Sequence, residues 1–171
     1  MKKTFLALGL FAAQFLYGQE DFSKYDISDS GCSFHTFGQL KPVDKATDDN
    51  SAIYTAESEY GGYTYGLILA RYNDPIPKDS IVRDGTLSMY VDITKDMMRA
   101  EDCTPPVKGL SLPNQPNATG WEGTCKLESG QTLYLKAWMD VRCVAVLYIH
   151  GADVPNDKVK ELFLNGIGFP Q

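Results

Sequence analysis

The chain has 171 residues, with 22 acidic side chains against 16 basic ones and a net charge of −6. An acidic surface repels phosphate backbones and anionic lipid head groups, so the composition argues against nucleic acid and anionic membranes as partners. The length fits one domain that buries a hydrophobic core of its own.

The N-terminus has the three zones of a secretory signal peptide. Lys2 and Lys3 are positive, residues 5–16 are mostly apolar, and small Gly18 precedes a polar segment that starts at Gln19. The apolar run is shorter than the roughly 20 residues of a membrane-spanning helix. We expect cleavage after Gly18, which leaves 14 basic residues against 22 acidic ones and a net charge of −8. The sequence therefore predicts a secreted or periplasmic bacterial protein without a stable membrane anchor.

Four cysteines follow this segment, and an even number in an exported protein favours two disulfides over free thiols. They form no Cys-x-x-Cys pair, which argues against a zinc or redox site. Four cysteines allow three pairings, and the sequence does not choose between them. We favour Cys103–Cys125 with Cys32–Cys143, because the first pair brackets a proline-rich loop.

In the first half of the chain, residues 19–30 are polar and predict a flexible arm. A short strand is expected over residues 32–37, followed by a turn-rich stretch over residues 41–51. Residues 52–60 and 63–72 then predict a hairpin. The glycines that join them, Gly61 and Gly62, both tolerate a positive φ.

Asp79 is expected to cap a helix that runs to about Glu101. Its apolar stripe comprises Leu87, Tyr90, Val91, Thr94, Met97 and Met98, at steps of three and four residues.

Residues 103–120 hold four prolines and predict a loop, and residues 121–127 a strand. A second hairpin is expected over residues 132–139 and 142–150. Its second strand is apolar on both faces and should be central in a sheet. A final helix is expected to start at Pro155 and Asn156, to stop at Gly166 and to be followed by a short tail that folds back.

This order predicts a single α+β domain over residues 31–171, an antiparallel sheet of about six strands with helices packed on it. Three segments of it resemble the PsbP-like family of α/β/α sandwich domains: residues 65–72 before a Pro-containing turn and a long helix, the hairpin 133–148, and the ending 160–169. That family includes the extrinsic photosystem II protein, a nuclear regulator that binds the GTPase Ran, and many uncharacterised bacterial exported proteins.

The resemblance covers about residues 31–169 and consists of packing positions and turns rather than chemistry. It implies an α/β/α sandwich and a non-enzymatic function. Gly166 and Gly168 depart from the family, since bacterial members often show Ser and a basic residue there, and the four cysteines are not a family signature. No position matches the contact surfaces for Ran or the photosystem, so neither partner carries over.

Two histidines, His35 and His150, are the imidazole candidates for catalysis. If Cys32 and Cys143 are neighbours, both histidines lie within reach of a cysteine, but a Cys–His nucleophile needs a free thiolate. The alternative is a disulfide beside two structural or exposed histidines. A metal site built on two histidines lacks an obvious third ligand. The sequence predicts no cofactor and no metal.

Acidic and aromatic residues gather around the first hairpin. The carboxylates of Asp44, Asp48, Asp49, Glu57 and Glu59 suit either a glycosidase acid–base pair or, as we favour, a solvated face. For the tyrosines there, two interpretations are open: they pack beneath a helix, or they form a contact surface for a partner. Tyr60 and Tyr63, at the hairpin tip, are the predicted partner contacts.

The sequence as a whole predicts an exported, non-catalytic binding or accessory protein whose partner is another exported protein, a basic one. The alternatives left open are a small exported hydrolase that uses His35 or His150, and a protein that binds a small ligand between sheet and helix.

Overall fold

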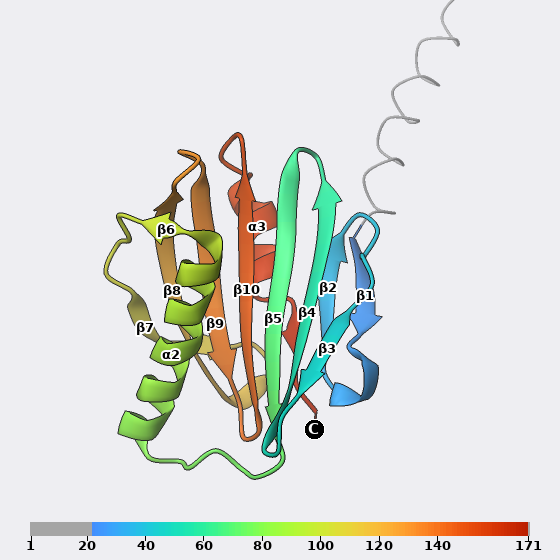
Figure 1. Ribbon diagram of the computed structural model, residues 1–171, viewed down its shortest axis with the longest axis vertical. Coiled ribbons are helices and arrows are strands. Elements are labelled where there is room, and N and C mark those ends of the chain that lie inside the picture. The colour runs from blue at the N-terminus through green and yellow to red at the C-terminus, as the bar shows by residue number, and fades with distance from the viewer. Residues whose placement is uncertain (1–21, 171) are drawn as a thin grey trace, which may run out of the picture.

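An antiparallel sheet of eight strands forms the centre of the molecule in the computed structural model, which describes residues 22–170 (Figure 1). The strand order is β3-β4-β5-β10-β9-β8-β6, and β7 pairs with β8. The strands are β3 (Asp44–Thr47), β4 (Ser51–Tyr60), β5 (Tyr63–Tyr72), β6 (Ala100–Glu101), β7 (Val107–Leu112), β8 (Gln115–Leu127), β9 (Thr132–Met139) and β10 (Cys143–Gly151).

Strand β10 lies between β5 and β9 and is buried on both faces. Side chains alternate along a strand. Cys143, Ala145, Leu147 and Ile149 therefore belong to one hydrophobic cluster, while Val144, Val146 and Tyr148 belong to the other. The expectation of a central strand here is confirmed.

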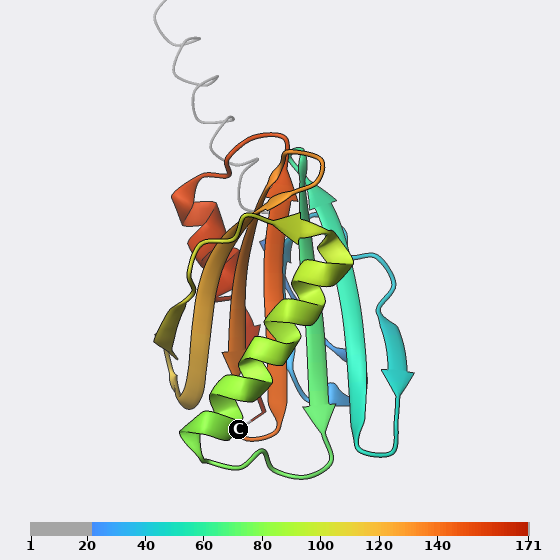
Figure 2. The same cartoon turned by 60° about the vertical axis from the view of Figure 1, so that its left-hand side comes forward.

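Helix α2 (Ser80–Met98) covers one face of the sheet and runs diagonally across it (Figure 2). The carboxylate of Asp79 caps the helix by accepting from the backbone N–H groups of Ile81 and Val82. The helix is confirmed with Leu87, Tyr90, Val91 and Thr94 buried. It ends at Met98 rather than near Glu101, which lies in strand β6, and Met97 of the predicted stripe is exposed.

A second, smaller layer covers the opposite face. It consists of a three-stranded sheet in the order β1-β2-β11 and of helix α3, together with the 3₁₀ turn η1 that joins β1 to β2. The elements are β1 (Phe22–Asp26), η1 (Ser28–Ser30), β2 (Ser33–Phe37), α3 (Asp157–Leu164) and β11 (Ile167–Gly168).

Two polar contacts join α3 to the large sheet. The indole Nε1 of Trp138 donates to the carbonyl of Leu164 at 2.7 Å. The buried ammonium of Lys136 pairs with Glu122 at 3.1 Å and with Glu161 at 3.2 Å. These two buried groups thus find partners, as burial requires, whereas the buried indole N–H of Trp121 in β8 has no hydrogen-bond partner among the described residues.

The predicted α/β/α sandwich with about six strands is wrong. Half of the described residues lie in strands and a fifth in helices, and the second layer is largely a small sheet rather than helices. The extra strands are short or lie at sheet edges. Such strands show little of the alternation of apolar and polar residues by which a strand is recognised in a sequence.

Three segments that read as irregular are in fact structured. The expected flexible arm forms β1 and η1 over residues 22–30, and residues 44–47 pair with β4 as strand β3. The proline-rich segment forms β7 and the start of β8. The pairing of these strands shifts register twice, and Gly109 and Asn114 in this segment have a positive φ. Pro105, Pro106 and Pro113 lie outside the strands. Pro116 lies near the start of β8, where it is paired with no residue of β7 or β9, so its missing N–H removes no ladder hydrogen bond.

Both predicted hairpins and the final helix are confirmed. Gly61 and Gly62 turn the β4–β5 hairpin with φ of 60° and 83°, and β9 pairs with β10 throughout. Asn156 caps α3 by accepting from the N–H of Lys158. The predicted signal peptide, residues 1–18, lies outside the described residues. No helix within residues 22–170 is long and apolar enough to cross a membrane.

Substitution of Gly66 tests the packing of the central strands. The ring of Tyr148 lies across Gly66, where a Cβ atom would overlap it, and its hydroxyl donates to Glu57 at 2.7 Å. We expect Gly66→Ala to lower the free energy of unfolding by about 1–3 kcal/mol, the usual cost of overpacking. Gly85→Ala is the control: its Cβ meets open space in a helix, so it should stabilise by up to about 1 kcal/mol. Urea unfolding of both variants measures the difference; an unchanged Gly66→Ala protein would contradict it.

Candidate functional site

A groove beside α2 exposes part of the sheet that the helix does not cover. Helix α2 contacts β6, β8, β9 and β10, which leaves the same face of β4 and β5 less protected. The hollow there has a volume of about 260 Å³. Its floor comprises Thr55, Glu57, Ile68 and Tyr148, and Met97 of α2 forms one wall. Lys41, Pro42 and Asp44, ahead of and within β3, form the other.

The outer face of α2 is unusually apolar. Of the nine exposed large hydrophobic residues among those described, five lie on this helix: Ile81, Val82, Met89, Ile93 and Met97. The last four recur at steps of seven, four and four residues and so share one face of the helix. We call these four residues the α2 stripe. Met89, Ile93 and Met97 are 46%, 43% and 59% exposed, so each leaves a large part of its side chain open to solvent.

Acidic groups border the groove and the stripe. Asp44 and Glu57 lie on the sheet side, and Asp92 and Asp96 on the helix. The two lysines nearby already have partners: Lys41 pairs with Glu59 at 2.7 Å, and Lys95 with Asp92 at 3.1 Å. The surplus of negative charge therefore favours a cationic occupant.

Burial also shapes the floor of the groove. It is the largest cause of the raised pKa of the Tyr148 hydroxyl, and the hydrogen bond to the Glu57 carboxylate raises it further. The Tyr148 hydroxyl thus stays neutral, and the Glu57 carboxylate, which is 40% exposed, faces the groove with Lys41 Nζ 3.8 Å away. Sequence reasoning missed this site, because Glu57 and Met97 are brought together by tertiary packing alone.

A second hollow, of about 410 Å³, lies over the ends of β4 and β5. Asp29 of η1 binds there to three neighbours: Lys45 Nζ at 2.7 Å, the Tyr54 hydroxyl at 2.8 Å and, through its backbone carbonyl, Arg71. These contacts hold the second layer on the large sheet. Two cationic side chains of this hollow, Lys45 and Arg71, are thus already bound to Asp29.

The predicted contact residues at the hairpin tip lie mainly in aromatic packing. Tyr60 is 40% exposed, and its ring stacks on Phe37 with 5.9 Å between centroids. Tyr63 is half-buried against the edge of Tyr65.

The two histidines lie far from a common site. The ring Nδ1 of His35 is 3.3 Å from the Gly166 carbonyl, and that of His150 is 3.2 Å from the Gln131 amide oxygen. Burial lowers the pKa of His150. His150 and Cys143 stand at opposite ends of β10, roughly 20 Å apart along an extended strand. His150 is therefore not placed to activate Cys143.

Of the clustered carboxylates, Asp44 and Glu57 line the groove together, whereas Asp48 and Glu59 are held by other contacts. Asp48 accepts hydrogen bonds from the N–H groups of Asn50 and Ser51, which lower its pKa, and Glu59 is held by Lys41. These contacts make the side chains turn caps and ion-pair partners. Among the described residues no group of three His, Cys, Asp or Glu side chains is placed to hold a metal ion.

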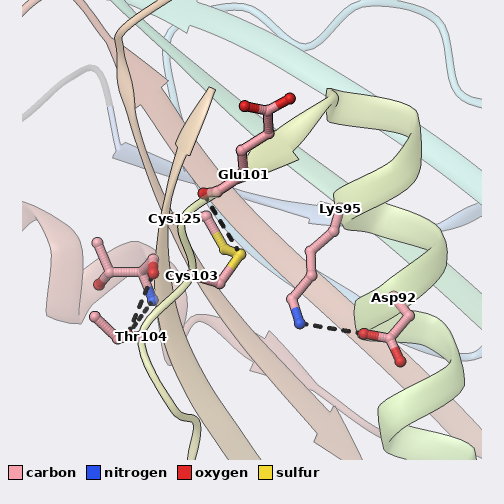
Figure 3. Close-up of a disulfide and its surroundings, with 7 residues drawn as sticks. Asp92, Lys95, Glu101, Cys103, Thr104 and Cys125 are labelled. Carbon is pink, nitrogen blue, oxygen red and sulfur yellow. Dashed lines mark hydrogen bonds and ion pairs between the residues drawn. A yellow bond between two sulfur atoms is a disulfide. The ribbon is translucent and has the colours of Figure 1, made fainter. Parts of the chain in front are cut away.

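The four cysteines separate into two neighbouring pairs. Cys103 and Cys125 form a disulfide, which confirms that predicted pairing (Figure 3). It ties the segment after β6 to β8, and the adjacent Thr104 strengthens the link by donating its backbone N–H to the Thr124 carbonyl at 2.9 Å. Cys32 and Cys143 are buried thiols whose Sγ atoms lie 3.5 Å apart.

The Asp29 contacts predict a pH-dependent stability. Hydrogen bonds from Lys45, then from Tyr54, lower the pKa of Asp29 to about 2. A depressed carboxyl pKa contributes stability that is present above the unfolded value of about 4 and is lost as the pH falls towards 2. We expect Asp29→Asn to lower Tm at pH 5 and 7, and the gap to wild type to shrink between pH 4 and 2. A gap that stays constant across a series of thermal melts would refute this role for Asp29.

Comparisons with known proteins identify no family for this chain. No protein-family model matches the chain, and the search of curated proteins finds no match. Among solved structures, an uncharacterised protein from Mycobacterium smegmatis is similar at 8% sequence identity with a TM-score of 0.33. The similarity covers 85% of this chain and 83% of that one.

Proposed function

We propose that this chain is a non-catalytic binding protein that holds a basic amphipathic helix of another exported protein against the α2 stripe and the adjacent groove. The observation that carries the proposal is the concentration of exposed apolar side chains on one face of α2. Contiguous apolar area on a soluble protein commonly marks an interaction surface.

The chemistry of the stripe suits a helical partner. Two of its four residues are methionines, whose unbranched side chains adapt to an apposed surface. Their spacing supplies anchor points for the i, i+3 or i+4, and i+7 positions of an amphipathic helix. The groove at Met97 extends the contact area onto the sheet.

The charges around the apolar surface favour a partner of positive charge. Asp44, Glu57 and Asp96 border the apolar surface, and the chain as a whole has a net charge of −6. Lysine or arginine on the flanks of a bound helix would gain attraction there, and acidic residues would be repelled. The sequence-based prediction of a basic partner agrees with this polarity. The PsbP-like resemblance stays a prediction, and the non-enzymatic function that it implies is consistent with a binding protein.

A defined peptide pair tests the proposal. The probe is a fluorescein-labelled amphipathic helix of leucine and lysine, and its counterpart replaces every lysine by glutamate. We expect the cationic peptide to bind, as measured by fluorescence anisotropy, and the anionic peptide not to. Ile93→Glu should weaken binding by roughly tenfold or more, the loss expected at an interface hot spot.

The substitution Ile93→Glu separates apolar docking from simple charge attraction. It makes the protein more acidic, so attraction by charge alone would strengthen binding of the cationic peptide. Val154→Glu adds the same charge at an exposed apolar residue away from α2 and should leave affinity nearly unchanged. Equal binding by the wild type and Ile93→Glu would overturn the proposal, as would binding that depends instead on Tyr60 and Tyr63.

Self-association is the competing use of the same surface. Light scattering after size-exclusion chromatography of the protein alone decides this point. A monomer supports a separate partner. A dimer that Ile93→Glu dissociates would show that the α2 stripe binds a second copy of the chain, and would refute the proposed partner.

A further inference from the structure

The second pair of cysteines, Cys32 and Cys143, is buried where two layers of the molecule meet. Cys32 stands between η1 and β2 in the small layer, and Cys143 is the first residue of β10 in the large sheet. Their Sγ atoms are 3.5 Å apart, and the residues are 1% and 0% exposed. They are 111 positions apart in the chain, so tertiary folding alone brings them together.

Hydrogen bonds fix the backbone on both sides of this contact. The N–H of Cys32 donates to Ser30 Oγ at 3.0 Å, and its carbonyl accepts from Ile27 at 2.9 Å. The N–H of Cys143 donates to the Asp140 carboxylate at 3.1 Å, and its carbonyl accepts from the Asp140 N–H at 3.0 Å. The two thiols are therefore held facing one another by folded structure on each side.

We propose that Cys32 and Cys143 form a second disulfide that covalently ties the small layer to the large sheet. The sulfurs need only approach from 3.5 Å to the S–S bond length of about 2.05 Å, a change within the reach of side-chain torsions and small backbone shifts. This inference does not depend on the proposed function, because it concerns the opposite face of the sheet from the groove.

The oxidation requires an electron acceptor. We take this acceptor to be the disulfide of a thiol oxidase or a small-molecule disulfide. A thiolate of one cysteine attacks the acceptor's disulfide, forms a mixed disulfide and releases one thiol. The second cysteine, as its thiolate, then attacks the mixed disulfide and releases the other. The protein loses two protons and two electrons, and the acceptor leaves as two thiols. A compartment that oxidises Cys103 and Cys125 also supplies this acceptor.

Burial sets the order in which the two bonds respond to reductant. Cys103 is exposed, so a reductant reaches the Cys103–Cys125 bond in the folded protein. Both sulfurs of the other pair are buried, which excludes an external thiol unless the small layer opens. For the same reason the second bond should form during folding, before the small layer closes on the sheet.

Thiol counting on the full chain tests the proposal. The protein is expressed with export to an oxidising compartment, purified without reductant, denatured and treated with iodoacetamide. We expect no alkylated cysteine, and a non-reducing proteolytic digest should contain one linked peptide pair with Cys32 and Cys143. Two alkylated thiols at these residues, or a linkage of either residue to Cys103 or Cys125, would overturn the proposal.

A second experiment uses the oxidised wild type and needs no variant to fold. Brief treatment with a phosphine reductant in native buffer should open Cys103–Cys125 and leave Cys32–Cys143 intact until denaturant is added. Equal reduction of both bonds in native buffer would contradict a buried cross-link.

The stability effect provides the matched comparison. The double variant Cys32→Ala/Cys143→Ala should lower Tm by roughly 5–15 °C, because the disulfide that it removes spans 111 residues. The loss should exceed that of Cys103→Ala/Cys125→Ala, which removes a disulfide spanning 22 residues. If the first variant had the same Tm as oxidised wild type, no covalent tie between the layers would exist.

Discussion

The burial of β10 on both faces is the constraint on which the rest of the structure depends. A strand at the centre of a sheet needs a covering layer on each side, since both sets of alternating side chains are apolar. Helix α2 supplies one layer; the small sheet with α3 supplies the other. Close packing requires Gly66 opposite Tyr148, and the side chains of Trp138 and Lys136 join the second layer through polar contacts.

The two layers differ in what they leave uncovered. One helix is too narrow for a sheet of eight strands, so α2 covers β8 to β10 and leaves the groove over β4 and β5. Its exposed side is then free to serve a partner, and the four apolar residues of the α2 stripe lie there beside the exposed carboxylates of Asp92 and Asp96. The proposed binding surface thus follows from the same asymmetry that gives the molecule its shape.

The small layer depends on a few specific contacts. It buries Ile27 and Phe34 and forms the Asp29 network, but its strands are short and β11 has only two residues. A covalent link at Cys32 would restrain this layer by reducing the freedom of the unfolded chain. The cysteine pairs occupy opposite faces of the sheet, as Cys143 belongs to one hydrophobic cluster and Cys125 to the other.

Local signals in the sequence were enough to predict several elements. The Gly61-Gly62 turn, the Asp79 and Asn156 caps, the apolar alternation of β10 and the Cys103–Cys125 pairing were predicted correctly, because each depends on neighbouring residues or on a short loop. The number of strands and the nature of the second layer were not, because short edge strands such as β1 and β3 exist through pairing with distant partners. Tertiary structure alone decided which face of α2 stays exposed and that Glu57 meets Met97 across a groove. It also brought Cys32 to Cys143, since such contacts depend on packing between segments that no local pattern relates.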